Sequence, residues 1–118
     1  MKQALRPLMH NGRPCGVGVV VVSNFVGRAV GLLGKAGLPE AQGLWISPCS
    51  SIHTFGMRFR IDVVMLDPTG RIVSLGADLS PWRLGPRGAQ GGAALELAAG
   101  AIEQLQFLVG DRLTLGDP

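Results

Sequence analysis

The sequence is poor in cysteine, and this scarcity excludes one class of site. Only two cysteines, Cys15 and Cys49, occur in 118 residues. They form no CxxC pair, and no cysteine and histidine stand at zinc-ligand spacing. The sequence therefore predicts no metal site and no cofactor. Both cysteines are expected to be free thiols, because no export segment is visible that would take the chain to an oxidising compartment.

The sequence also lacks a long apolar run. Its longest aliphatic stretch covers residues 17–22 and is broken by Gly18, whereas a membrane helix needs about 20 apolar residues. The stretch is therefore expected to be a buried strand, and no membrane partner is predicted. The first eleven residues carry no apolar segment of the kind found in secretory signals. A cytoplasmic location is the resulting expectation.

Charge is sparse and unclustered. Charged residues make up 16% of the chain and hydrophobic residues 47%, which excludes a disordered polymer. The net charge is +3, yet the basic residues are scattered from Lys2 to Arg112 and no row of aromatic residues alternates with them. Nucleic-acid binding usually needs such a basic, aromatic surface, so no nucleic-acid partner is predicted.

What the sequence does contain is glycine, at 18 positions. Glycine is unfavourable inside helices because it loses the most backbone entropy on folding, so the composition favours strands joined by tight turns. No internal repeat or linker interrupts the chain. Its length suits one domain, and we expect that domain to span residues 1–118.

Apolar and β-branched segments separated by turn residues predict the strands. Asn11-Gly12 is typical of a hairpin turn, and Asp67-Pro68-Thr69-Gly70 is typical of a β-turn. An all-β fold is expected, a β-sandwich or a jelly-roll-like barrel of seven to eight short strands with one or two short helices. The expected strands cover residues 3–9, 17–23, 44–47, 51–55, 61–66, 71–75, 93–97 and 111–115; the helices cover 24–33 and 99–104; long loops cover 34–42 and 80–92.

One segment gathers side chains with nucleophilic, basic and acidic chemistry. Cys49 and His53 lie close in sequence, and Asp62 follows nine residues after His53. A thiol becomes a useful nucleophile only when a base is within hydrogen-bond reach and a third group orients that base. The spacing allows this arrangement without requiring it. The alternative for His53 is a partly buried imidazole that is hydrogen-bonded to the backbone.

Asp62 stands out because it interrupts an apolar strand and shares a face with Val64 and Leu66. An unpartnered buried charge costs several kcal/mol, so this carboxylate must be paired. It is expected either to clasp loop amides or form an ion pair, or to form one wall of a polar pocket. The candidate ion-pair partners are Arg28, Arg58 and Arg83.

Two further acidic residues are assigned from their neighbours. Glu96 lies between Leu95 and Leu97, and strand alternation predicts that its side chain faces solvent. Asp111 follows Gly110 and is expected to hydrogen-bond nearby backbone in a turn.

The long loop at residues 80–92 carries Trp82, Arg83 and Arg87. An aromatic platform beside guanidinium groups suits anionic or sugar ligands, so these residues are candidates for an exposed binding lip. The alternative is that Trp82 packs over one end of the fold.

Several sequence blocks, taken in order, resemble one protein family. The chain from Val17 to Leu115 is similar to the bacterial and archaeal family called domain of unknown function 192. This resemblance implies a compact jelly-roll type of β-sandwich with a short helix after an early strand, and it implies no catalytic or ligand-binding residue. The blocks are RAVGLLG at 28–34, IDVVMLD at 61–67, GRIV at 70–73, LELAAG at 95–100 and VGDR at 109–112.

Together these features predict a non-enzymatic binding or accessory module. Its partner would be a small polar, anionic or carbohydrate-like ligand, or another protein. One alternative is a hydrolase-like enzyme that uses His53 and Asp62, and another is a structural subunit without a small-molecule site. The candidate ligand-binding residues are His53, Asp62, Trp82, Arg83 and Arg87.

Overall fold

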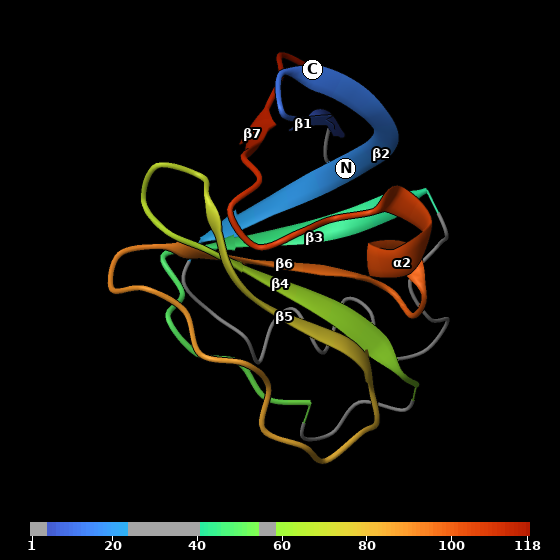
Figure 1. Cartoon of the computed structure of the whole chain (residues 1–118), viewed down its shortest axis with the longest axis vertical. Helices are drawn as coiled ribbons and strands as arrows, with labels where there is room; N and C mark the ends of the chain where they lie inside the picture. The colour runs from blue at the N-terminus through green and yellow to red at the C-terminus, as the bar shows by residue number, and fades with distance from the viewer. Residues whose placement is uncertain (1–4, 24–40, 55–58) are drawn as a thin grey trace.

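The computed structural model describes residues 5–23, 41–54 and 59–118, and within them the chain is built mainly of strands (Figure 1). Seven strands form one sheet in the order β5-β4-β6-β3-β2-β1-β7, which confirms the predicted all-β class. One short helix, α2 (Ala101–Leu105), follows β6. The strands are β1 (Arg6–His10), β2 (Arg13–Ser23), β3 (Gln42–Ser47), β4 (Ile61–Leu66), β5 (Ile72–Leu79), β6 (Ala93–Ala98) and β7 (Leu113–Leu115).

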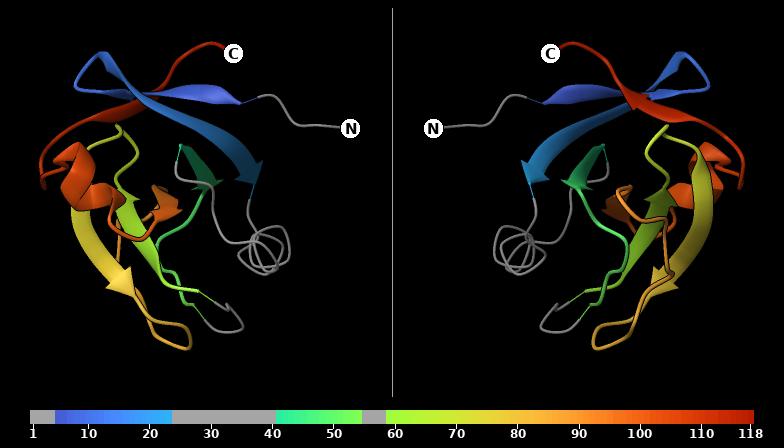
Figure 2. Two further views of the ribbon diagram at one scale, coloured as in Figure 1. Left: turned by 90° about the vertical axis from the view of Figure 1, so that its right-hand side faces the viewer. Right: turned by 90° about the vertical axis from the view of Figure 1, so that its left-hand side faces the viewer.

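The sheet is strongly curled, as Figure 2 shows, with β1, β2 and β7 crossing above the other strands. The β2–β3 pair is parallel and the remaining pairs are antiparallel. Backbone hydrogen bonds also join the start of β5 to the segment before β7, including Ile72 N–H to the Asp111 carbonyl at 2.8 Å. The sheet is nevertheless not closed into a barrel.

Two hydrophobic cores lie on the two faces of this sheet. The α2-side core lies where α2 and Phe107 cover β4 and β6, and the loop-side core lies where the segment after β3 covers the same strands. The α2-side core includes Leu8, Val64, Leu66, Leu95, Leu97, Ile102, Phe107 and Leu113. The loop-side core includes Leu44, Ile46, Ile52, Ile61, Val63, Met65 and Ala94.

Both predicted turns are confirmed, and each follows from local chemistry. Asn11 and Gly12 have φ values of 50° and 85°, which is the left-handed region that a tight Asn-Gly hairpin requires. In the second turn the Gly70 N–H donates to the Asp67 carbonyl at 3.0 Å. A side chain at Gly70 would lie 2.5 Å from the Leu113 carbonyl oxygen, so the turn needs glycine there.

The structure differs from the sequence expectation in the segment after β3 and at the end of β5. The expected strand at 51–55 is not a regular strand where it is described, because only His53 forms an isolated bridge. Strand β5 runs on to Leu79 rather than ending at Leu75. The expected helix at 24–33 and most of the loop at 34–42 lie outside the described residues. In the described part of the chain, no helix is long and apolar enough to cross a membrane.

Candidate functional site

Two irregular segments, residues 50–54 and 82–88, lie side by side and hold most of the predicted site residues. We call them the paired segments. Four backbone hydrogen bonds of 2.8–3.0 Å join them: Thr54 N–H to Arg83 O, Trp82 N–H to Thr54 O, Gly85 N–H to Ile52 O and Gly88 N–H to Ser50 O. Backbone bonds of this kind fix a loop without regular strand geometry. The loop is therefore ordered along its contact with residues 50–54.

Thr54 fastens the paired segments with its side chain, which is fully buried. Its hydroxyl accepts the Arg83 N–H at 2.8 Å and donates to the Ser80 carbonyl at 2.7 Å. A buried hydroxyl needs such partners, because an unpaired one costs free energy. Thr54 was not predicted as a site residue, because no local pattern distinguishes it from an ordinary strand threonine.

Close backbone approach also explains a glycine between the two segments. A Cβ atom built on Gly85 would lie 2.4 Å from Cγ2 of Ile52, a distance at which atoms overlap. Since Ile52 is itself buried in the loop-side core, its side chain has little room to move away. Glycine at this position lets the loop lie directly on Ile52.

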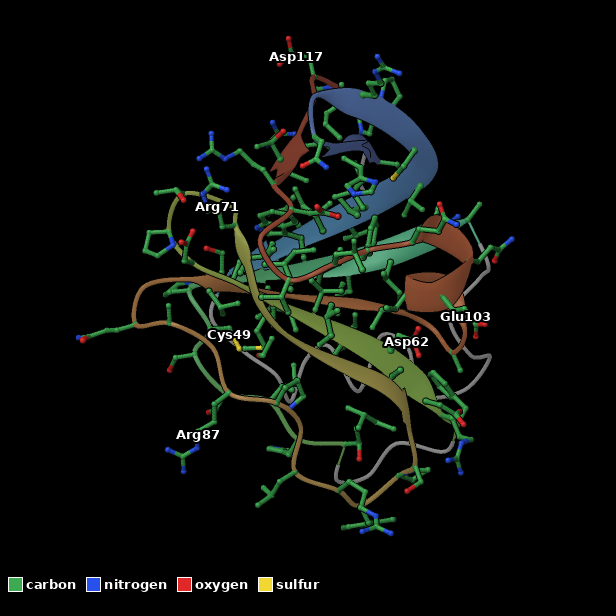
Figure 3. All side chains as sticks on the ribbon, in the orientation of Figure 1. Cys49, Asp62, Arg71, Arg87, Glu103 and Asp117 are labelled. Atoms are coloured by element: carbon green, nitrogen blue, oxygen red, sulfur yellow. The ribbon has the colours of Figure 1, made fainter. Side chains whose placement is uncertain are left out.

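Four neighbouring side chains of the loop reach solvent, and we call them the lip: Trp82, Arg83, Leu84 and Arg87. Trp82 is 69% exposed and Leu84 is 78% exposed. Both arginines are exposed as well, and Arg87 points away from the body of the molecule in Figure 3. The lip contains the three loop residues predicted from sequence and adds Leu84, which was missed because a leucine is normally expected in a core.

The backbone at Trp82, the first residue of the lip, is strained. Trp82 has a φ of 64°, in a region that bulky non-glycine residues rarely occupy. Its N–H is held by the Thr54 carbonyl at 3.0 Å, and the Arg83 guanidinium donates to the Ser80 hydroxyl at 3.2 Å. Strain of this kind persists only where surrounding contacts impose it, and it is concentrated at functional sites.

The structure places His53 in the paired segments, beside the lip. His53 is half-buried between two buried neighbours, Ile52 and Thr54, and its backbone bridges to Leu84. The structure therefore brings His53 together with three other predicted residues, Trp82, Arg83 and Arg87.

Asp62 lies elsewhere, on the α2-side face of β4 and near α2 in Figure 3. Its side chain is fully buried. One carboxylate oxygen accepts the Asp78 N–H at 2.7 Å and the other accepts the Ile102 N–H at 2.8 Å. Of the alternatives predicted for Asp62, the structure therefore has the one in which its carboxylate accepts hydrogen bonds from backbone amides, and we call this arrangement the clasp.

The clasp separates Asp62 from the other candidates. Ile52, next to His53, packs on the opposite face of the sheet from Asp62. Of the three arginines predicted as its partners, Arg83 bonds Ser80 instead, and Arg28 and Arg58 lie outside the described residues. The geometry does not support a catalytic group made of His53 and Asp62.

The prediction for Glu96 is wrong. Its side chain has no exposed surface, and neither carboxylate oxygen has a hydrogen-bond partner among the described residues. Burial raises the pKa of this carboxyl from 4.5 to about 7. The alternation rule failed because β6 lies in the middle of the sheet with a core on each face, so both of its sides are covered.

Both described cysteines are free thiols, as predicted. Burial raises the pKa of Cys49 and the charge of Glu96 raises it further, while a hydrogen bond from the Ser51 backbone lowers it. A raised thiol pKa leaves little thiolate near neutral pH, and the thiolate is the nucleophile. The environment of Cys49 therefore does not favour nucleophilic catalysis.

No group of metal ligands accompanies the lip in the part of the chain that the structure describes. No group of three or more His, Cys, Asp or Glu side chains there could hold a metal ion. A surface groove of about 230 Å³ lies between β2 and α2, lined in part by Cys15, Val17 and Gln104. None of the predicted site residues lines this groove.

Fold and site together define an all-β protein that displays a basic and aromatic lip on a hydrogen-bonded loop. The chain belongs to the family domain of unknown function 192, whose model, described as an uncharacterised ACR, matches residues 8–115. This confirms the resemblance inferred from the sequence blocks.

Named relatives agree with this assignment. The chain is 32% identical over 100 residues to the UPF0127 protein PH1112 of Pyrococcus horikoshii, a match that covers 80% of this chain and 84% of the relative. Two solved structures share the fold alone. A protein from Sinorhizobium meliloti 1021, described as a proposed transcription regulator, gives a TM-score of 0.78 at 18% identity over 98% of this chain and 96% of its own. A protein of unknown function from Novosphingobium aromaticivorans gives a TM-score of 0.77 at 16% identity, and the match covers 95% of this chain and 86% of its own.

Proposed function

We propose that this protein is a non-enzymatic binding module, and that its lip binds a protein segment in which acidic and apolar residues stand together. The observation that supports this most directly is the exposure of Trp82 and Leu84, at 69% and 78%, on a loop that is held by backbone hydrogen bonds. Side chains this exposed stand out into solvent rather than line an enclosed pocket, which favours an extended partner over a small molecule.

The composition of the lip supports a protein interface. Tryptophan and arginine are the residues most enriched at energetic centres of interfaces, and the lip contains one tryptophan and two arginines. Its loop is also fixed before binding, through the Thr54 contacts, so little loop entropy is lost when a partner docks. The lip is small, so the interaction is expected to be weak and transient.

Charge complementarity indicates an acidic partner. Residues 79–95 and 41–61 contain no aspartate or glutamate, so no acidic side chain of the paired segments offsets Arg83 and Arg87. An acidic partner gains Coulomb attraction to these arginines, and the attraction weakens with salt.

The hydrolase-like alternative is less well supported. It needs His53 and Asp62 to act together, whereas both oxygens of Asp62 accept backbone N–H groups on the other face of the sheet. The alternative of a structural subunit remains a possible outcome of the binding experiment.

Trp82 provides its own reporter for that experiment. The chain has two tryptophans, and Trp45 is half-buried against the α2-side core. In a Trp45→Phe background, the fluorescence of Trp82 is titrated with a peptide of alternating glutamate and leucine. Saturable quenching or a spectral shift is expected, with an affinity that falls by at least tenfold when salt is raised from low to high concentration.

Matched double variants separate the lip from general electrostatics. Arg83→Ala with Arg87→Ala should weaken peptide binding at least tenfold. Arg13→Ala with Arg112→Ala removes the same charge from exposed positions away from the lip and should change it little. Equal weakening by both pairs, or no saturable binding by the wild type, would overturn the proposal and leave the structural-subunit alternative.

A further inference from the structure

Glu96 occupies the centre of the sheet, on the face that the first of the paired segments covers. In register it lies opposite Leu44 of β3 and Val63 of β4, and both of these residues belong to the loop-side core. Ile52 packs in the same core, and Cys49 packs against it. The Glu96 carboxyl therefore lies beneath the segment that holds the lip.

The surroundings of Glu96 are almost entirely apolar. The described residues that build this face come from β2, β3, β4, β5 and β6, from the covering segment and from Phe59, which precedes β4. The titratable group among them is the Cys49 thiol, which interacts electrostatically with Glu96. The apolar members are Val20, Val22, Leu44, Ile46, Ile52, Phe59, Ile61, Val63, Met65, Leu79 and Ala94.

In this environment a neutral carboxyl costs little free energy, whereas an ionised carboxyl costs much more. Its two oxygens have no hydrogen-bond partner among the described residues, so an ionised form would lack the compensation that a buried charge needs. Asp62 on the neighbouring strand shows the contrast, because each of its oxygens has a backbone N–H donor.

We propose that Glu96 is a proton-controlled latch: protonated, it lets residues 49–54 pack on the sheet, and ionised, it draws in water and releases them. The loop that carries the lip is released with them, because the Gly85 and Gly88 N–H groups donate to the carbonyls of Ile52 and Ser50. This inference rests on the proposed function in one respect, namely that the released loop carries the binding residues.

The direction of the pH effect follows from burial. The folded-state pKa of Glu96 is raised from 4.5 to about 7, so the folded state holds a proton that the unfolded chain has released. The contribution of the protonated Glu96 carboxyl to the free energy of unfolding is fully present below pH 4.5 and is lost as the pH rises through about 7. Across that interval the ratio of unfolded to folded protein should increase by about 300-fold relative to a chain without the carboxyl.

The first test compares the wild type with Glu96→Gln by urea unfolding from pH 5 to 8.5. Because histidines as a class titrate in this range, both proteins also carry His53→Asn. The wild type should lose stability relative to Glu96→Gln up to pH 7 and then keep a constant difference. Parallel pH profiles would overturn the proposal. Glu96→Met, an apolar side chain of similar length, provides a second comparison and should also abolish the pH dependence.

The second test detects release of the segment in the folded protein. In a Cys15→Ala background, Cys49 is the sole thiol, and its rate of reaction with a disulfide reagent is measured at pH 6 and pH 8. The Glu96 charge by itself suppresses the Cys49 thiolate, so without release Glu96→Gln would react faster at pH 8. Release predicts the opposite order, with the wild type at least several-fold faster.

Amide exchange identifies which part of the chain opens. Between pH 6 and 8, the exchange rates of Gly85 and Gly88 in the wild type, corrected for intrinsic pH dependence, should rise more than those in Glu96→Gln. The Leu113 amide, which donates to Gly70 at 2.8 Å, serves as the reference for global stability and should rise less than the amides of Gly85 and Gly88. An equal rise at all three amides would mean global unfolding and would overturn the latch. None of these measurements uses a ligand, so a failure of lip binding and a failure of the latch are distinguishable.

Discussion

Replacing Asp62 tests whether this buried carboxylate holds the fold together, as its geometry indicates. It accepts two backbone N–H groups, from Asp78 at 2.7 Å and from Ile102 at 2.8 Å. Hydrogen bonds to a charged group contribute about 1.5–3 kcal/mol each. Asp62→Ala removes both and leaves two donors unpaired, so we expect a loss of about 3–5 kcal/mol.

Asp62→Asn is the sharper variant because it keeps the shape of the side chain. One oxygen can still accept an N–H, but the NH2 group then faces the other donor, and a loss of about 2–3 kcal/mol is expected. Small domains have total stabilities of about 5–15 kcal/mol, so urea unfolding followed by circular dichroism resolves either effect. Asp117→Asn, at an exposed position, is the matched charge control and should change stability little.

One result would refute this reasoning. If Asp62→Asn unfolds within about 0.5 kcal/mol of the wild type, the clasp contributes nothing and Asp62 becomes a candidate functional group again. A second observable is local. Amide exchange at Ile102 should accelerate in Asp62→Asn more than exchange in the β1–β2 hairpin, because the N-cap residue of helix α2, Gly100, provides no side-chain cap.

Two further predictions concern the paired segments. Thr54→Val should lower the free energy of unfolding in urea by about 1–3 kcal/mol, since it leaves the Arg83 N–H and the Ser80 carbonyl without their partner. The control Thr114→Val, at an exposed position, should lower it far less. Equal losses would contradict the role given to Thr54. Gly85→Ala should lose more than about 1 kcal/mol because the new methyl would lie 2.4 Å from Ile52, and an unchanged unfolding midpoint would show that the loop does not lie as closely on Ile52 as the structure has it.

Local sequence features predicted the turns and the clearest strand. Asn11-Gly12 needs positive φ values that these residue types adopt readily, and the Asp67–Gly70 turn combines proline and glycine at favourable positions. Strand β4 could be predicted from an apolar run that only Asp62 interrupts. Such features succeed because the physical cause and the affected residues lie within a few positions of each other.

The less successful predictions all depend on contacts between distant residues. Alternation assigned Glu96 to one side of its strand but could not indicate that this side is covered. Residues 51–54 are apolar and β-branched in part, yet they pair with an irregular loop about thirty positions away. For Asp62, the cost of a buried charge predicted that partners exist, while the identity of those partners, Asp78 and Ile102, follows only from the tertiary arrangement.

Asp62 and Glu96 lie on neighbouring strands and on opposite faces of one sheet, and the difference in their surroundings explains why they should behave differently. Asp62 has a donor for each oxygen, so its charge is compensated and stabilises the fold. Glu96 has no donor among the described residues and is surrounded by apolar side chains, so its neutral form is the one that fits. Replacing Glu96 by an apolar residue would therefore relieve a cost rather than create one. A buried carboxyl that burdens the fold near neutral pH, beneath the segment that holds the lip, is the physical basis for assigning it a regulatory rather than a structural role.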